Sequence, residues 1–310
     1  MDEVICTINL TKIYGGVHAV DNLNLSVKKG EILGFLGING AGKTTTMKML
    51  LGMITPTSGR CYIQGQNVSK GDTNIWRDVG YIVETPHSYP DLTVKENLDI
   101  TRRLRGIEDK SCVDWIIKKL KLEEYASMKA KHLSLGNAQR LGIAKAIIHK
   151  PKVLILDEPT NGLDPAGIVE IRMLLMDLVE NSGVTVLISS HKLEEISKIA
   201  TNIAIIHSGK LIRSMDTMEL ENQLKKSLIL DGKNRMAMKS VLTKAGYKVH
   251  IEERSSTYLK IWDQYAVNNP DKIATLLVNA ECPPTLLKVE KENLEMYFIR
   301  TIKEIGGNFE

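Results

Sequence analysis

The sequence predicts an α/β fold, with helices around a mostly parallel β-sheet, followed by a smaller α+β domain. Two near-continuous aliphatic runs, KVLILDEP (152–159) and VTVLISSH (184–191), are typical of strands buried on both faces of a parallel sheet. Between them, AGIVEIRMLLMDLVENSG (166–183) predicts a helix that ends at Gly183. Parallel strands joined by helices indicate an α/β core.

The other elements of the first 220 residues follow from local patterns. We expect strands over 4–10 and 23–31 at an antiparallel edge, and further strands over 31–37, 77–84 and 203–210. A helix is expected over 44–53, ended by Gly52 and Pro56. The sequence over 93–150 is expected to be mainly helical. These elements define a first domain of residues 1–220, with a helical subdomain at about 85–150.

The pattern changes after about residue 220. We expect strands over 227–230, 247–253, 257–262 and 285–290, with helices over 236–246, 270–280 and 294–302. The order β-α-β-β-α-β fits a small ferredoxin-like unit. We identify no catalytic constellation in this stretch, so residues 221–310 are expected to form an accessory or regulatory domain.

Composition limits the classes of function. The chain has 41 basic and 37 acidic residues, a net charge of +4, and no basic run with interleaved aromatic residues, so we expect no nucleic-acid partner. No apolar run approaches the ~20 residues of a membrane span, and the acidic N-terminus is unlike a signal peptide. We therefore expect a cytoplasmic protein with reduced thiols at its four widely spaced cysteines, Cys6, Cys61, Cys112 and Cys282.

A phosphate-binding loop is predicted at GINGAGKT, residues 37–44. It matches GxxxxGK[ST] and lies between a buried strand and a helix, the context in which this motif holds a nucleotide. Lys43 would reach the β- and γ-phosphates, the Thr44 hydroxyl would bind Mg²⁺, and the start of the helix adds partial positive charge. The residues expected to contact ATP here are Asn39, Gly40, Ala41, Gly42, Lys43, Thr44 and Thr45.

Two acids and a histidine end the predicted core strands. Asp157 is placed to hold Mg²⁺ through water, and Glu158 to orient or deprotonate an attacking water. An Asp-Glu pair alone would more often be a turn or a helix cap, but the phosphate loop favours the catalytic interpretation. His191 is either structural or a sensor that donates a hydrogen bond to the γ-phosphate.

The stretch LSLGNAQR (133–140) contains no acid, base or nucleophile. Ser134 and the Gly136 backbone at a predicted helix start would cradle an anion. The simpler interpretation is an ordinary helix N-cap.

The motifs occur in the order phosphate loop, LSLGNAQR, LILDEP, NGLD and SSH, and in this order the chain resembles the ATP-binding subunits of ABC transporters over about residues 4–220. This resemblance implies two such domains stacked head to tail, so that the signature loop of one caps the γ-phosphate held by the other. It assigns Ser134, Gly136 and Asn137 to that loop, Asp164 to the dimer seam, and Tyr14 to stacking on adenine. The alternative for Tyr14 is an ordinary tyrosine at the edge of a strand. The usual LSGGQ is LSLGN here, with Leu135 in place of a glycine and Asn137 in place of the glutamine.

A second departure from the family lies in YIVETPHSYPDLTVKENL, where Glu84 occupies the place of a glutamine. The resemblance implies that this side chain contacts Mg²⁺ and the attacking water and borders the groove for the membrane subunit. A carboxylate carries charge and only accepts hydrogen bonds, unlike an amide. The alternative is a surface acid beside Pro86. A glutamate followed by Pro and Tyr resembles the bacitracin-resistance and lantibiotic-immunity branch of exporters.

The resemblance therefore implies an ATPase subunit that forms a dimer around two Mg-ATP and powers a separate permease at the inner face of the membrane. We expect the two subunits of the dimer to be identical. A soluble ABC-type ATPase acting on nucleic acid or ribosomes is the alternative, although such proteins typically carry two ATPase domains or a long coiled-coil insertion. A nucleotide-switched module without catalysis is disfavoured by the intact Lys43, Asp157 and Glu158. The cargo, its direction and the permease stay open.

Overall fold

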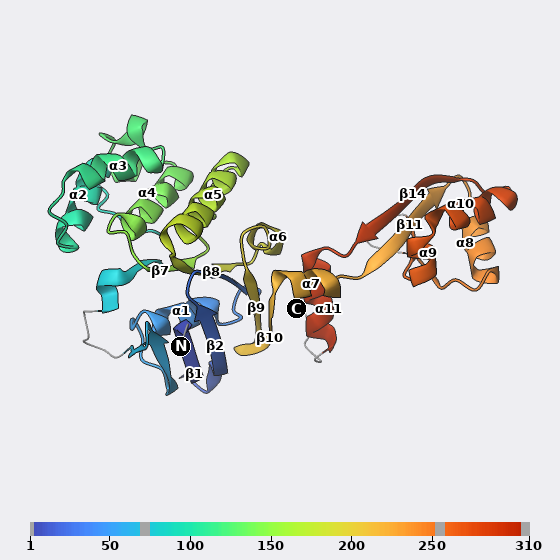
Figure 1. Ribbon diagram of the computed structural model, residues 1–310, viewed down its shortest axis with the longest axis horizontal. Coiled ribbons are helices and arrows are strands. Elements are labelled where there is room, and N and C mark those ends of the chain that lie inside the picture. The colour runs from blue at the N-terminus through green and yellow to red at the C-terminus, as the bar shows by residue number, and fades with distance from the viewer. Residues whose placement is uncertain (1–2, 69–74, 252–257, 305–310) are drawn as a thin grey trace. The chain divides into compact units, whose positions relative to one another are not determined.

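A six-stranded sheet lies at the centre of the first of two compact units, Met1–Thr217 and Met218–Glu310, into which the chain divides. The structure is a computed structural model that describes residues 3–68, 75–251 and 258–304 (Figure 1). The strand order is β10-β9-β3-β8-β7-β6, and all neighbours are parallel except β9 and β10. The strands are β3 (Ile32–Leu36), β6 (Val79–Ile82), β7 (Val153–Asp157), β8 (Thr185–Ser190), β9 (Asn202–His207) and β10 (Lys210–Asp216).

The aliphatic runs form the centre of this sheet because every residue of β3, β7 and β8 is buried. The predicted parallel core is thus confirmed. The strand predicted over 203–210 is wrong at its end. It stops at His207, and Ser208 and Gly209 both adopt positive φ (47° and 78°). Two such residues make a tight turn that matches the twist of a hairpin, so the chain returns as β10.

A second, antiparallel sheet covers the N-terminal part of the first unit. Its order is β2-β1-β4-β5, with β1 (Glu3–Tyr14), β2 (Val17–Lys28), β4 (Ser58–Ile63) and β5 (Gln66–Asn67). The first two strands extend beyond the predicted alternating runs because both lie in one long hairpin. Apolar side chains of this sheet, such as Ile5 and Leu23, share one hydrophobic core with Phe35 and Leu187 of the central sheet.

Helices complete the first unit. They are α1 (Lys43–Leu50), α2 (Val94–Leu104), α3 (Ser111–Lys119), α4 (Leu135–Ile147), α5 (Pro165–Ser182) and α6 (Leu193–Ile196), with short 3-10 helices η1 (Ile75–Asp78), η2 (Glu123–Tyr125) and η3 (Ala130–His132). In α2, Thr93 and Glu96 form a reciprocal capping box. As predicted, α5 ends at Gly183, whose φ is 66°. Arg140 of α4 and Glu170 of α5 form an ion pair at 2.7 Å that joins these helices.

The second unit contains a four-stranded antiparallel sheet of order β12-β13-β11-β14, in which the last strand lies beside the first. This agrees with the ferredoxin-like order predicted from the sequence. Residues 252–257 lie outside the described residues. They include the end of the strand predicted over 247–253 and the start of the strand predicted over 257–262. From Thr217 onward, the helices and strands are α7 (Thr217–Gln223), β11 (Lys226–Gly232), α8 (Arg235–Lys244), β12 (Val249–Ile251), β13 (Leu259–Ile261), α9 (Gln264–Asn268), α10 (Pro270–Asn279), β14 (Pro284–Lys291) and α11 (Leu294–Glu304).

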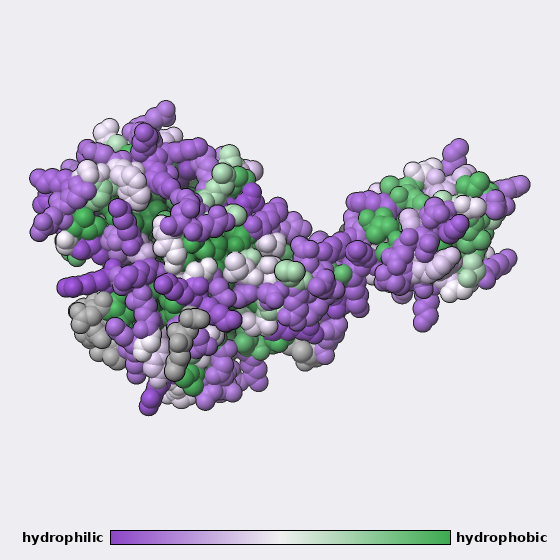
Figure 2. Space-filling model, viewed as in Figure 1, coloured by the Kyte–Doolittle hydropathy of each residue, from purple (hydrophilic) through white to green (hydrophobic). Residues whose placement is uncertain are grey.

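The surface of each unit is mainly hydrophilic on the face shown in Figure 2, with apolar side chains in scattered patches. Within the described ranges, no helix combines the length and apolar character needed to cross a membrane.

We predict that His149, which follows α4, makes stability depend on pH. Its Nε2 lies 3.1 Å from the Val79 carbonyl oxygen, and burial, with the nearby Arg105 charge, lowers the pKa of His149 to about 4 from 6.5. The unfolded chain therefore takes up the proton first, so stability is lost as the pH falls from about 6.5 to about 4. His149→Gln should flatten the decline of the thermal midpoint across this window. An equal decline in both proteins would contradict the assignment.

Candidate functional site

The phosphate loop connects β3 to α1 and depends on glycine. Gly42 has a φ of 106°, and a Cβ there would lie 2.4 Å from the carbonyl oxygen of Ala19. Only glycine fits this backbone. Asn39 and Gly40 are exposed at the tip of the loop, whereas Ala41 is buried. The loop leads directly into α1, which begins at Lys43. A phosphate held by the loop would therefore lie at the partially positive N-terminal end of this helix.

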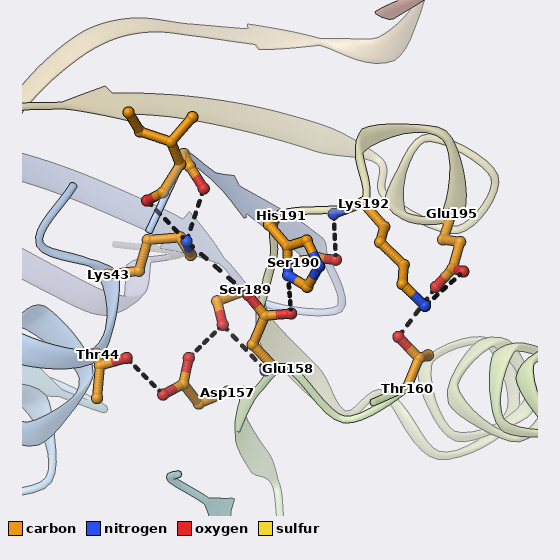
Figure 3. Close-up of polar contacts among 12 residues, drawn as sticks. Lys43, Thr44, Asp157, Glu158, Thr160, Ser189, Ser190, His191, Lys192 and Glu195 are labelled. Atoms are coloured by element: carbon orange, nitrogen blue, oxygen red, sulfur yellow. Dashed lines mark hydrogen bonds and ion pairs between the residues drawn. The ribbon is translucent and has the colours of Figure 1, made fainter. Parts of the chain in front are cut away.

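The Lys43 side chain folds back into the loop and is buried. Its Nζ donates to the carbonyl oxygens of Gly37 at 2.6 Å and Ile38 at 3.2 Å, and lies 3.9 Å from Glu158 Oε1 (Figure 3). Burial lowers the pKa of Lys43, and the charges of Glu158 and Asp157 partly oppose that shift. The ammonium is held by backbone dipoles, which an anionic phosphate oxygen can replace.

Asp157 lies at the end of β7 between two hydroxyl groups. Its Oδ2 accepts a hydrogen bond from Thr44 Oγ1 at 2.7 Å, and its Oδ1 accepts one from Ser189 Oγ at 2.5 Å (Figure 3). Asp157 and Ser189 face each other because β7 and β8 are paired in parallel at these positions. A buried carboxylate beside a hydroxyl is a set of hard oxygen ligands, which suits Mg²⁺.

Glu158 and His191 are joined directly. His191 Nδ1 lies 2.7 Å from Glu158 Oε2 (Figure 3). The Glu158 backbone has a φ of 50°, the left-handed region, and its N–H donates to Ser189 Oγ at 3.1 Å. This turn directs the carboxylate away from the strand and places it beside both His191 and Lys43.

A cavity of about 570 Å³ brings several predicted site residues together. Tyr14 at its edge is 49% exposed, with Lys12 Nζ 5.0 Å from its ring centroid, and is therefore accessible for stacking. Glu84 also lines the cavity, and its Oε1 accepts from Lys48 Nζ at 2.6 Å. The lining residues among those predicted from sequence are Tyr14, Thr44, Thr45, Glu84, Asp157 and Glu158.

The residues predicted from the LSLGNAQR stretch to contact a nucleotide do not line this cavity. Ser134 is the N-cap of α4 and accepts from the Asn137 N–H at 3.3 Å, which is the ordinary capping role. Leu135 lines the cavity and is 63% exposed. Gly136 packs closely on the Gly162 backbone, and Asp164 caps α5 by accepting from the Gly167 N–H at 3.0 Å. The described residues that line the cavity do not include four that were predicted from the sequence: Ser134, Gly136, Asn137 and Asp164.

Three polar residues of the site were missed from sequence. Ser189 contacts both acids because it lies opposite Asp157 on the neighbouring parallel strand, a pairing that the sequence does not show. Gln139 is buried and its Nε2 donates to the Pro159 carbonyl oxygen at 2.9 Å, which ties α4 to the turn after Glu158. Lys48 shows no distinctive sequence signal, because its contact with Glu84 joins residues 36 positions apart.

The comparisons with known proteins agree with this geometry. The family model described as ABC transporter matches residues 20–161. The bacitracin transport ATP-binding protein BcrA of Bacillus licheniformis is 40% identical over 310 residues, covering 99% of both chains. The chain belongs to the ATP-binding subunits of ABC transporters.

Other ABC proteins extend the comparison. The lantibiotic transport ATP-binding protein SrtF of Streptococcus pyogenes is 38% identical over 73% of this chain and 98% of its own. The dimeric, post-hydrolysis structure of the ATP-binding cassette MJ0796 with ADP and Pi has a TM-score of 0.64 and 28% identity over 69% of this chain and 98% of that one. This ABC subunit is therefore an ATPase that binds ATP, and the predicted fold, family and activity are confirmed.

Ser189→Ala should destabilise the first unit of this ABC subunit. The change removes the hydroxyl that donates to buried Asp157 and accepts from the Glu158 N–H, and losing partners of buried polar groups costs about 1–3 kcal/mol. Urea unfolding would measure the loss. Ser190→Ala is the matched control, because that equally buried hydroxyl accepts only from the Lys192 N–H among the bonds shown in Figure 3. Equal stability of Ser189→Ala and the unaltered protein would contradict a structural role for this hydroxyl.

Proposed function

We propose that this subunit hydrolyses Mg-ATP at the cavity beside the phosphate loop, with Thr44 and Asp157 holding the metal. The single observation that carries this proposal is the 2.7 Å contact of these two oxygen ligands next to Glu158 and Lys43. Bound Mg²⁺ would neutralise charge on the phosphate oxygens. Lys43 would exchange its loop carbonyls for the β- and γ-phosphates, and Tyr14 would stack on the adenine. Asn39, Gly40, Ala41, Gly42 and Thr45 would complete the nucleotide contacts.

Glu158 is proposed as the group that orients or deprotonates the attacking water. In the structure its carboxylate is held by His191, with Oε2 2.7 Å from Nδ1. His191 would turn from Glu158 to the γ-phosphate when the nucleotide is bound, and return after hydrolysis. During phosphoryl transfer, before His191 returns, Glu158 would take the proton of the attacking water.

The active form is proposed to be a dimer, most simply of two identical subunits. In that arrangement Ser134, Gly136 and Asn137 of one copy would contact the γ-phosphate held by the other, with Asp164 at the seam. The exposure of Ser134 and Leu135 at the start of α4 supports this, because the start of a helix is a favourable place for an anion. The dimeric MJ0796 cassette is a precedent for the assembly.

Glu158→Gln should trap an ATP-bound dimer, because the amide cannot take the proton while the nucleotide contacts remain. Light scattering of the full-length variant with saturating Mg-ATP would show the doubled mass, and phosphate release should fall by about 10²–10⁴. Lys43→Ala, which weakens nucleotide binding, is the control that should stay monomeric. A monomeric Glu158→Gln protein at saturating nucleotide would contradict the sandwich.

The partner of the dimer is proposed to be a separate membrane permease, with this chain peripheral to the inner face of the membrane. The cargo is proposed to be a peptide antibiotic of the bacitracin or lantibiotic type. The similarity over the whole chain to a bacitracin transport protein, and over 73% of the chain to a lantibiotic transport protein, supports this assignment. A soluble ABC-type ATPase acting on nucleic acid or ribosomes gains no support from these relatives.

Residues 1–220 are proposed as the ATPase domain and 221–310 as an accessory, regulatory domain. The division into compact units at Thr217 and Met218 supports this boundary. The relative from Bacillus licheniformis matches both parts, whereas the lantibiotic relative is matched over 229 residues. These coverages support a second part that is an addition to the ATPase domain.

Glu84→Gln should change antibiotic protection in cells that carry the permease, while ATP affinity at saturating Mg²⁺ changes little. The carboxylate carries a charge that glutamine lacks, and it lines the nucleotide cavity without touching the phosphate loop backbone in the contacts described. Protection would be measured as the inhibitory concentration of bacitracin and of a lantibiotic. Unchanged protection against both would contradict a coupling role for the Glu84 charge.

A further inference from the structure

Lys48 and Glu84 form an ion pair shared by two cavities. Nζ of Lys48, on α1, lies 2.6 Å from Oε1 of Glu84, which follows β6. Both residues, with Thr85 and Pro86, line the nucleotide cavity and also a neighbouring groove of about 500 Å³. The pair is therefore common to the site of hydrolysis and a second depression on the same unit.

The charges of the two cavities differ. Among the described residues lining the nucleotide cavity, three are acids (Glu84, Asp157 and Glu158) and Lys48 is the sole base. The described lining of the groove contains several basic side chains, including Arg105 and Lys145, and Glu84 is its sole acid. Repulsion from Asp157 and Glu158 disfavours the Glu84 carboxylate on the nucleotide side, so Lys48 is the group that offsets this repulsion.

We propose that Lys48 is the positioning residue of Glu84: its ammonium holds the carboxylate at the shared wall and must release it before the carboxylate can turn to the metal site at Thr44 and Asp157. This inference rests on the proposed Mg-ATP site. Glutamine at position 84 would need no such counter-charge, so the pairing is specific to a carboxylate there.

The pair is suited to exchange because it is accessible to water. The Lys48 and Glu84 side chains are 29% and 57% exposed, and ion pairs of this exposure are weak. A weak pair can hold the carboxylate and still yield to a doubly charged cation. A buried pair would instead lock the carboxylate in place.

The test is a Mg²⁺ titration of the binding of a fluorescent ATP analogue to the full-length protein. Lys48→Met removes the charge and keeps the length of the side chain, so the half-saturating Mg²⁺ concentration should fall about two- to fivefold. In a Glu84→Gln background the same change should have no effect, because the competition is gone. Lys48→Arg should restore the unaltered value. Lys119→Met, which breaks a similarly exposed pair with Asp177 at 2.8 Å, is the matched control and should change nothing.

An equal fall in both backgrounds would overturn the inference, since Lys48 would then act on the metal by direct repulsion rather than through Glu84. An unchanged Mg²⁺ requirement in Lys48→Met would overturn it as well, provided that the variant melts at the temperature of the unaltered protein; Lys48→Gln gives a second test if it does not. Analogue binding that is independent of Mg²⁺ in the unaltered protein would contradict the proposed metal site itself and the inference with it.

Discussion

The parallel pairing of β7 with β8 is the constraint on which the site depends. It sets Asp157 opposite Ser189, and from this contact the two acids obtain their positions: Ser189 donates to Asp157 and accepts from the Glu158 N–H. The hydroxyl of Thr44, at the start of α1, then completes a chain of polar contacts across three elements. Buried polar groups without partners are costly, so this network and the burial of the aliphatic strands favour the same register.

Electrostatics explain why the site is set up for a phosphate. Lys43 is buried against carbonyl oxygens, and burial lowers its pKa even though two carboxylates lie near it. An ammonium in such surroundings is stabilised by an anion that brings more charge than a backbone dipole. The same cavity carries a surplus of carboxylates, which a divalent cation would offset. Under the proposed assignment, nucleotide and metal would therefore offset each other's charge in this cavity.

Two of the departures from the usual family sequence lie at the outer parts of the site, whereas buried residues at its centre keep the usual types. Leu135 and Glu84 are both substantially exposed, whereas Lys43 and Asp157 are buried and keep the usual residue types. Exposed positions tolerate a change of side chain because water can solvate it, while a buried ionic network cannot absorb one.

The sequence by itself determined the α/β core, the phosphate loop, the two acids and the family, because each rests on a local pattern: aliphatic runs, glycine spacing, and motif order along the chain. Even the ferredoxin-like strand order of the second unit followed from the succession of short elements. The end of β9 was missed although Ser208 and Gly209 are turn-forming residues, because the predicted strand was carried past the aliphatic run into them. Only the tertiary structure decided the partners of Ser189, Gln139 and Lys48, whose contacts span 32, 20 and 36 positions. Such contacts arise when separate strands and helices pack together, and no local pattern of hydrophobicity or turn residues encodes which side chains then meet.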